Sequence, residues 1–183
     1  MSVWVTSDCH FGHKNVIKYE NRKYTNVEEM DLDLINRWNS KVGIKDEIYI
    51  LGDFTLSNNK SYAIDILKRL NGRKYLILGN HDNISQKKEV MVYFEWVKKY
   101  FELDYKDNHF VMFHFPILSW NRKYHGAIHL YGHIHGNKLT EYQIVNEIVM
   151  KNSYNVSVEV NNYEPISLDE IIAKLNSATE NEV

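Results

Sequence analysis

The sequence has few of the residues that would direct it to a membrane, a disulfide scaffold or a disordered state. It holds one cysteine, Cys9, which excludes an internal disulfide framework and fits a reducing compartment, so we expect a cytoplasmic protein. We find no apolar run of membrane-spanning length and no signal peptide, which predicts no membrane association. The net charge of −2 gives no electrostatic footprint for duplex nucleic acid.

The remaining composition favours one globular domain. The chain has 183 residues, of which 44% are hydrophobic, enough for one well-formed core. We find no internal repeat and no linker rich in proline, glycine or serine. We therefore expect a single domain over residues 1–176, followed by a flexible polar tail over residues 177–183.

Four short apolar segments end in polar residues and lack a helical period, which predicts buried strands. Helical patterns lie between the early ones: Val27, Met30, Leu34 and Trp38 fall on one helical face, and Tyr62, Ile66 and Leu70 repeat it. This alternation indicates a largely parallel sheet covered by helices. The four segments are VWVTSDCH (3–10), IYILGDF (48–54), KYLILGNHD (74–82) and FVMFHF (110–115).

The second half contains closely spaced strand-like segments and ends in a helix that begins near Ser167, with Glu170 completing a capping box. The fold class we predict is therefore α/β, a four-layer α/β/β/α sandwich of two mixed sheets flanked by helices. The strand-like segments are 109–114, 127–133, 142–150 (YQIVNEIVM) and 155–160 (NVSVEV).

Polar residues follow the predicted strands at the edge where open α/β sheets gather their sites. In extended backbone, Asp8 and His10 would share one face while Cys9 points the other way, and His133 and His135 would do the same. Imidazole, carboxylate and amide groups suit divalent transition metals, and there are too many of them for one ion. The candidate metal ligands are Asp8, His10, Asp53, Asn80, His114, His133 and His135.

The ordered set DCH (8–10), GD (52–53), GNHD (79–82), His114 and GHIH (132–135) resembles the signature of the calcineurin-like metallophosphoesterases, in particular their small single-domain bacterial and phage members. The resemblance implies two divalent metal ions. Asp8, His10, Asp53 and His135 would hold the first ion. Asp53, Asn80, His114 and His133 would hold the second, with Asp53 bridging. Manganese is our expectation for both ions, with iron, zinc, nickel or cobalt as alternatives.

The resemblance also implies a mechanism. Two dications would neutralise a phosphate ester and activate a bound hydroxide that attacks phosphorus. His81 and Asp53 are the predicted catalytic residues: His81 would stand beside the metals and protonate the leaving oxygen. Asp82 would orient this loop.

Four further residues are candidates for substrate binding. His13 belongs to an HFGH segment close to the first motif, whereas Trp120, Arg122 and His125 lie in a loop near His114 and would stack on a base or hold phosphate. A solvated His13 and a Trp120 that only covers the core are the alternatives. For Arg22 and Lys23 we expect a solvated charged loop.

The segment GDFTLSN lacks the Asp-Arg pair of the Ser/Thr protein phosphatases, which disfavours that activity. We expect a phosphodiesterase on nucleotide-like substrates, nucleic-acid ends included. One alternative is a phosphatase for small phosphorylated metabolites. The other is a protein-binding scaffold of the same fold, although such scaffolds lack the histidine that His81 provides.

Overall fold

A computed structural model describes residues 1–136 and 152–180 of the chain. Its first sheet has the strand order β4-β3-β2-β1-β9, in which β1 to β4 are parallel and β9 is antiparallel to β1. The strands are β1 (Val3–Thr6), β2 (Glu47–Ile50), β3 (Arg73–Ile77), β4 (Trp96–Lys98) and β9 (Ile166–Ser167).

The second sheet has the order β5-β6-β7-β8, and it is also mixed because β5 is antiparallel to β6 whereas β7 and β8 run parallel to it. The predicted α/β architecture of two mixed sheets with flanking helices is therefore confirmed. The strands are β5 (Tyr100–Tyr105), β6 (Asn108–Phe113), β7 (Ile128–Tyr131) and β8 (Ser153–Asn155).

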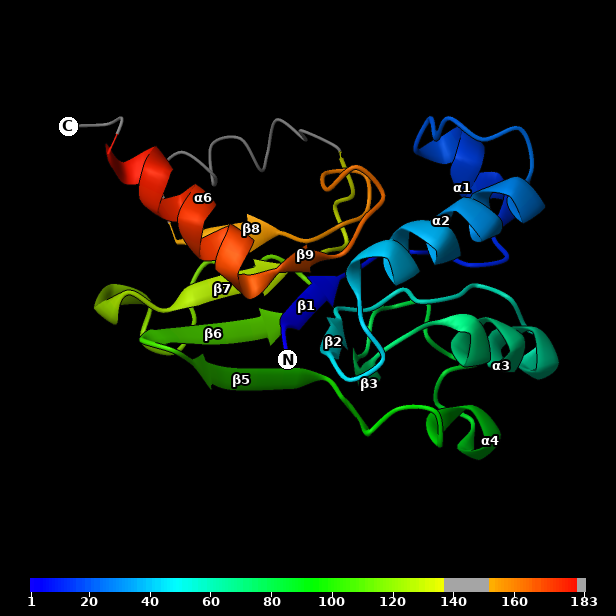
Figure 1. The fold of residues 1–183 in the computed structure, drawn as a ribbon, viewed down its shortest axis with the longest axis horizontal. Coiled ribbons are helices and arrows are strands. Elements are labelled where there is room, and N and C mark those ends of the chain that lie inside the picture. The colour runs from blue at the N-terminus through cyan, green and yellow to red at the C-terminus, as the bar shows by residue number, and fades with distance from the viewer. Residues whose placement is uncertain (137–151, 181–183) are drawn as a thin grey trace.

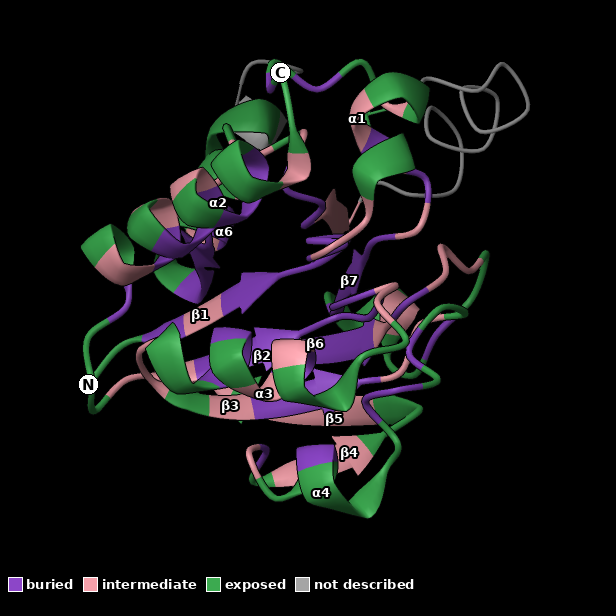
Figure 2. Cartoon of the chain, turned by 90° about the vertical axis from the view of Figure 1, so that its right-hand side faces the viewer, coloured by how far each residue is buried: buried purple, intermediate pink, exposed green. Residues whose placement is uncertain are grey.

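Alternating side chains of the first sheet supply two separate cores. In β2, Ile48 and Ile50 pack on the helix side, whereas Tyr49 and the residue just after the strand, Leu51, pack between the sheets. Period-two alternation of this kind requires apolar residues on both faces, which explains the continuous apolar runs in the sequence. Figure 2 shows β1 and β2 mostly in the colour of buried residues.

Helices cover the first sheet on one side, and α6 packs on the core between the two sheets. The first four gather beside β1–β3, opposite the second sheet, and α6 lies over β9 (Figure 1). Ser167 and Glu170 form the predicted capping box at the start of α6, with Glu170 N donating to Ser167 Oγ at 3.2 Å. The helices are α1 (Lys14–Tyr19), α2 (Val27–Lys41), α3 (Lys60–Arg69), α4 (Lys88–Met91) and α6 (Leu168–Glu180).

Two expectations about the second half differ from the structure, and a third concerns residues that the structure does not describe. The segment 155–160 is not a strand, because β8 ends at Asn155 and the chain then turns. Residues 177–180, which we assigned to a flexible tail, belong to α6. The expected strand 142–150 lies outside the described residues.

Among the described residues, no helix has both the length and the apolarity needed to cross a bilayer.

Candidate metal centre

The predicted ligands lie one to four residues beyond the carboxyl ends of their strands. Asp8 and His10 follow β1, Asp53 follows β2, and His114 comes directly after β6. Because β1 to β3 are parallel, and β6 and β7 are parallel, the loops that leave them meet at one edge of the sandwich.

The backbone at these positions is left-handed rather than extended, so our geometric reason for the shared face was wrong. Asp8 has φ 58° and His10 has φ 53°, and Asp53, His133 and His135 also have positive φ. Few non-glycine residues adopt this conformation, and clusters of such residues are typical of functional sites. Cys9 does point away, into the core on the helix side.

Short distances join the two predicted ligand sets. Asp53 Oδ2 lies 3.6 Å from His10 Nε2 and 3.6 Å from His114 Nε2, so one carboxylate oxygen faces one histidine of each set. His135 Nε2 lies 3.8 Å from Asp8 Oδ1, and the rings of His10 and His135 stack with centroids 5.1 Å apart. The carboxylate of Asp8 belongs to two groups of potential ligand atoms, one with His10 and His135 and one with Asp53 and His114.

The backbone orients His114, one of the two histidines in the second predicted ligand set. His114 Nδ1 lies 2.7 Å from the carbonyl oxygen of Leu51, to which it can donate, and this leaves the lone pair of a neutral ring on Nε2. That atom is 3.0 Å from Asn80 Oδ1, also an acceptor. Two acceptors at this distance are stabilised by a cation between them. The ring centroids of His133 and His114 lie 5.1 Å apart.

Three donors hold one oxygen of Asp8. Its Oδ2 accepts hydrogen bonds from Ser7 Oγ at 2.6 Å, Ser157 Oγ at 2.9 Å and the backbone N–H of His133 at 3.0 Å. These contacts fix the carboxylate and leave Oδ1 to face the cluster.

Buried atoms without partners test whether a metal fits. Asp8 Oδ1 and both ring nitrogens of His10 are buried and have no hydrogen-bond partner among the described residues. Unpaired buried polar atoms are costly, and a cation would satisfy those that face the cluster. Burial, helped by neighbouring histidines, lowers the pKa of His10 to about 2, which keeps its ring in the neutral form that binds metals. Burial raises the pKa of Asp8, although the charges of His135 and His114 oppose the shift. The residues therefore fit divalent metal ions.

Two glycines allow the loops to approach closely. A Cβ at Gly79 would overlap Asp53, and a Cβ at Gly132 would overlap Ser7 and the carboxylate of Asp8. Any side chain at either position would displace the carboxylates of the cluster.

Asp82 ties the two central loops together. Its carboxylate accepts the backbone N–H groups of Gly79 and Asp53 at 2.8 Å each, and that of Phe54 at 3.0 Å. Burial raises the pKa of Asp82 to about 6, an effect that these three donors oppose. Asp82 thus holds the loop that carries Asn80 and His81 against Asp53.

Two further histidines border the cluster. His81 is exposed, its backbone N–H donates to Asp53 Oδ1 at 2.9 Å, and its ring centroid lies 5.7 Å from that of His10. His13 lies at the start of α1, with its ring centroid 5.5 Å from that of His10 and 6.3 Å from that of Tyr19.

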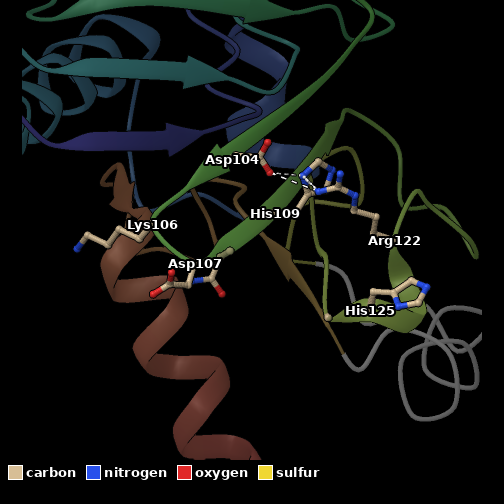
Figure 3. Close-up of a pocket in the computed structure, with 8 residues that line it drawn as sticks. Asp104, Lys106, Asp107, His109, Arg122 and His125 are labelled. Carbon is tan, nitrogen blue, oxygen red and sulfur yellow. Dashed lines mark hydrogen bonds and ion pairs between the residues drawn. The ribbon is translucent and has the colours of Figure 1, made fainter.

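The other three predicted substrate residues do not join the cluster. Trp120 is buried and donates its indole N–H to Ala127 O at 2.9 Å, so it covers the outer face of the second sheet. Arg122 and His125 line a cavity of about 510 Å³ beside the β5–β6 hairpin (Figure 3). This cavity is at the amino end of β6, five residues from His114, or about 17 Å along the strand.

Sequence reasoning missed a group of supporting residues. Arg22 is buried rather than solvated and donates to the carbonyl oxygens of Asp8 and Cys9. Glu159, in a segment predicted only as a strand, accepts from both Arg22 and His135. The signal available in that segment was the alternation of polar residues at 155, 157 and 159.

Comparison with known proteins gives consistent matches. The sequence profile described as "Calcineurin-like phosphoesterase" matches residues 1–105. The uncharacterized protein MJ1445 of Methanocaldococcus jannaschii is 42% identical over 171 residues, which is 93% of this chain and 89% of that protein. The Gene 66 protein of Mycobacterium phage L5 is 42% identical over 83 residues, 44% of this chain and 40% of the phage protein. The crystal structure of AQ665 from Aquifex aeolicus, a protein of unknown function, superimposes with a TM-score of 0.73 at 26% identity, covering 94% of this chain and 98% of that one.

Proposed function

Because this chain belongs to the calcineurin-like phosphoesterase family, we propose that it is a dinuclear metal-dependent phosphoesterase acting on nucleotide-like phosphodiesters. The family resemblance that the five motifs indicated is correct. The pair of metals, the diester preference and the roles of individual residues are our proposals.

Two overlapping sets of residues would hold the ions. Asp8, His10 and His135 form one set, Asn80, His114 and His133 form the other, and Asp53 is shared. The position of Asp53 Oδ2, at 3.6 Å from a histidine of each set, supports a bridging role. When bound, the ions would neutralise the ester and lower the pKa of an attacking water. Mixed nitrogen and oxygen ligands accept several ions, and we propose manganese as the resident one, in a cytoplasmic protein.

His81 is the proposed general acid. Its side chain is exposed at the rim of the cluster, while its backbone N–H is fixed by Asp53 Oδ1. The loop is thus anchored through the main chain, which leaves the imidazole ring available to face an ester. A protonated ring nitrogen would donate its proton to the leaving oxygen as the bond to phosphorus breaks.

The surface of α1 supports a nucleotide-like leaving group. Tyr19 has 68% of its surface exposed, and its ring meets His13 edge-on at the border of the cluster. Lys14 and Lys18 are exposed on the same helix, and neither forms an ion pair within the part of the chain that the structure describes. A helix that carries an exposed aromatic ring and two cations without ion-pair partners among the described residues suits a base joined to a phosphate.

The observation that carries the proposal is the buried, unpaired ligand set of Asp8 Oδ1 and the two ring nitrogens of His10. The direct test is hydrolysis of bis-p-nitrophenyl phosphate and of p-nitrophenyl phosphate with added Mn²⁺, with a chelator-treated sample as control. We expect turnover that needs metal and favours the diester. A monoester preference would support the phosphatase alternative, and no turnover with any of several metals would support the scaffold.

The substitution Tyr19→Ala tests the substrate class. We expect KM for a nucleotide diester to rise by at least about fivefold, because one stacking contact contributes about 1–3 kcal/mol. The value of kcat for bis-p-nitrophenyl phosphate should change little. The matched control is Tyr124→Ala, which alters a tyrosine with 90% exposure in the loop that carries Arg122 and His125. Equal KM values for wild type and Tyr19→Ala would contradict base stacking.

A further inference from the structure

One polar face, which begins at the last residue of β8 and continues into the segment after it, supports the metal centre. Asn155, Ser157 and Glu159 alternate with Val156 and Val158, which are buried in the two cores. Asn155 Nδ2 donates to the carbonyl oxygen of His135 at 2.8 Å, and Ser157 Oγ donates to Asp8 Oδ2 at 2.9 Å. The third polar residue, Glu159, makes the contacts with the clearest chemical consequence.

Glu159 orients the ring of His135. Its Oε1 lies 3.0 Å from His135 Nδ1, which donates to it in the neutral ring and leaves the lone pair on Nε2. That nitrogen faces Asp8 Oδ1 at 3.8 Å. A carboxylate that accepts the outer N–H of a histidine makes the inner nitrogen a stronger metal ligand.

The same oxygen of Glu159 balances the charge of Arg22. Arg22 Nε donates to it at 2.8 Å, and the side chain of Arg22 has no exposed surface. The other guanidinium nitrogens donate to Asp8 O at 2.7 Å and Cys9 O at 2.9 Å. These bonds hold the peptides on either side of Cys9 while Asp8 keeps its left-handed backbone.

The two halves of the cluster differ in what supports them. His114 is oriented by the carbonyl oxygen of Leu51, and Asp53 is held through the loop that Asp82 fixes. Neither contact involves Glu159 or Arg22. One half therefore depends on a buried charged side chain from the C-terminal part of the chain, whereas the other depends on backbone and on Asp82.

We propose that Glu159 is a positioning residue for one of two cation sites, the one formed by Asp8, His10 and His135. It sets the tautomer of His135 directly and the backbone of Asp8 through Arg22. The inference rests on the proposed function only in assuming that the cluster holds divalent cations.

The test is titration of metal-free protein with Mn²⁺, followed by calorimetry and by electron paramagnetic resonance. For the wild type we expect two ions per chain and a spin-coupled signal. For Glu159→Gln we expect one ion to bind within threefold of the wild-type affinity and the other to bind about 10–100-fold more weakly. At one equivalent the variant should give the signal of an isolated Mn²⁺ ion.

Two other variants distinguish a specific loss of metal affinity from a general loss of folding. Glu159→Asp keeps the charge beside Arg22 but withdraws the carboxylate from His135, and it should also weaken one ion. Glu164→Gln makes the same chemical change at a carboxylate that pairs with Arg37 and Lys41, and both affinities should stay at the wild-type values.

Wild-type affinity for both ions in Glu159→Gln and Glu159→Asp would overturn the proposal. Equal weakening of both ions together with a lower melting temperature would also overturn it, because that result indicates a purely structural role. A wild-type protein that binds two ions but hydrolyses no ester would reject the proposed enzyme and leave this inference intact.

Discussion

The two ends of the second sheet each carry a histidine–carboxylate cluster, and the clusters differ in whether their polar atoms have partners. At the carboxyl end, His114 joins His10, Asp8 and Asp53 in a buried cluster that contains ligand atoms without partners. At the amino end, His109 lies between Asp104, 2.6 Å from its Nδ1, and Glu102, 2.9 Å from its Nε2. Both ring nitrogens of His109 therefore have a carboxylate neighbour within the protein.

The difference shows which histidine–carboxylate clusters favour metal. Ion pairs at a surface satisfy their own charges and contribute little to stability. A buried cluster with unsatisfied acceptors has a cost that only a cation or a proton removes. The two clusters thus predict opposite responses to substitution.

The largest effect should follow Asp53→Ala. The shared carboxylate faces a histidine of each ligand set, so its loss should weaken both ions at once. We expect less than half an ion per chain by plasma mass spectrometry after desalting, and a loss of phosphoesterase activity of at least about 10³-fold. Retention of two ions would contradict the bridging role.

The next effect should follow His81→Ala. The side chain is outside both ligand sets, so two ions should stay bound, while kcat should fall by about 10²–10⁴-fold because general acid help is lost. The matched control is His109→Ala at the other end of the sheet. It should leave both metal content and kcat at wild-type values. Wild-type turnover in His81→Ala would remove this residue from the mechanism.

The smallest effect should follow Arg122→Ala. Its guanidinium lies 3.7 Å from Asp104 and 3.4 Å from His109, both at the exposed end (Figure 3). We expect no change in KM or kcat for phosphodiesters and a change in unfolding free energy within about 1 kcal/mol by denaturant titration. A clear rise in KM would restore Arg122 as a substrate contact and bring the two ends into one site.

Much of the fold could be predicted because strand and helix periods are local properties. The alternation around Ile48 and the helical face of Met30, Leu34 and Trp38 correspond to the two cores of the structure. The capping box formed by Ser167 and Glu170 was also predicted from the sequence and is confirmed. The predicted strand at 155–160 was wrong, because periodicity alone does not distinguish a strand from an extended turn. In the structure, the alternating residues of this segment line a turn that packs on the N-terminal loop.

The sequence by itself determined the two-sheet architecture, the family and the positions of the candidate ligands, because these depend on short motifs at strand ends. Only the tertiary structure decided which of the other polar residues lie beside that cluster. It buried Arg22 and Trp120, moved Arg122 and His125 to the far end of the sheet, and brought Glu159 to His135 across 24 residues. The physical reason is that a side chain acts through the atoms it meets in space, and long-range packing, not local sequence, sets those contacts.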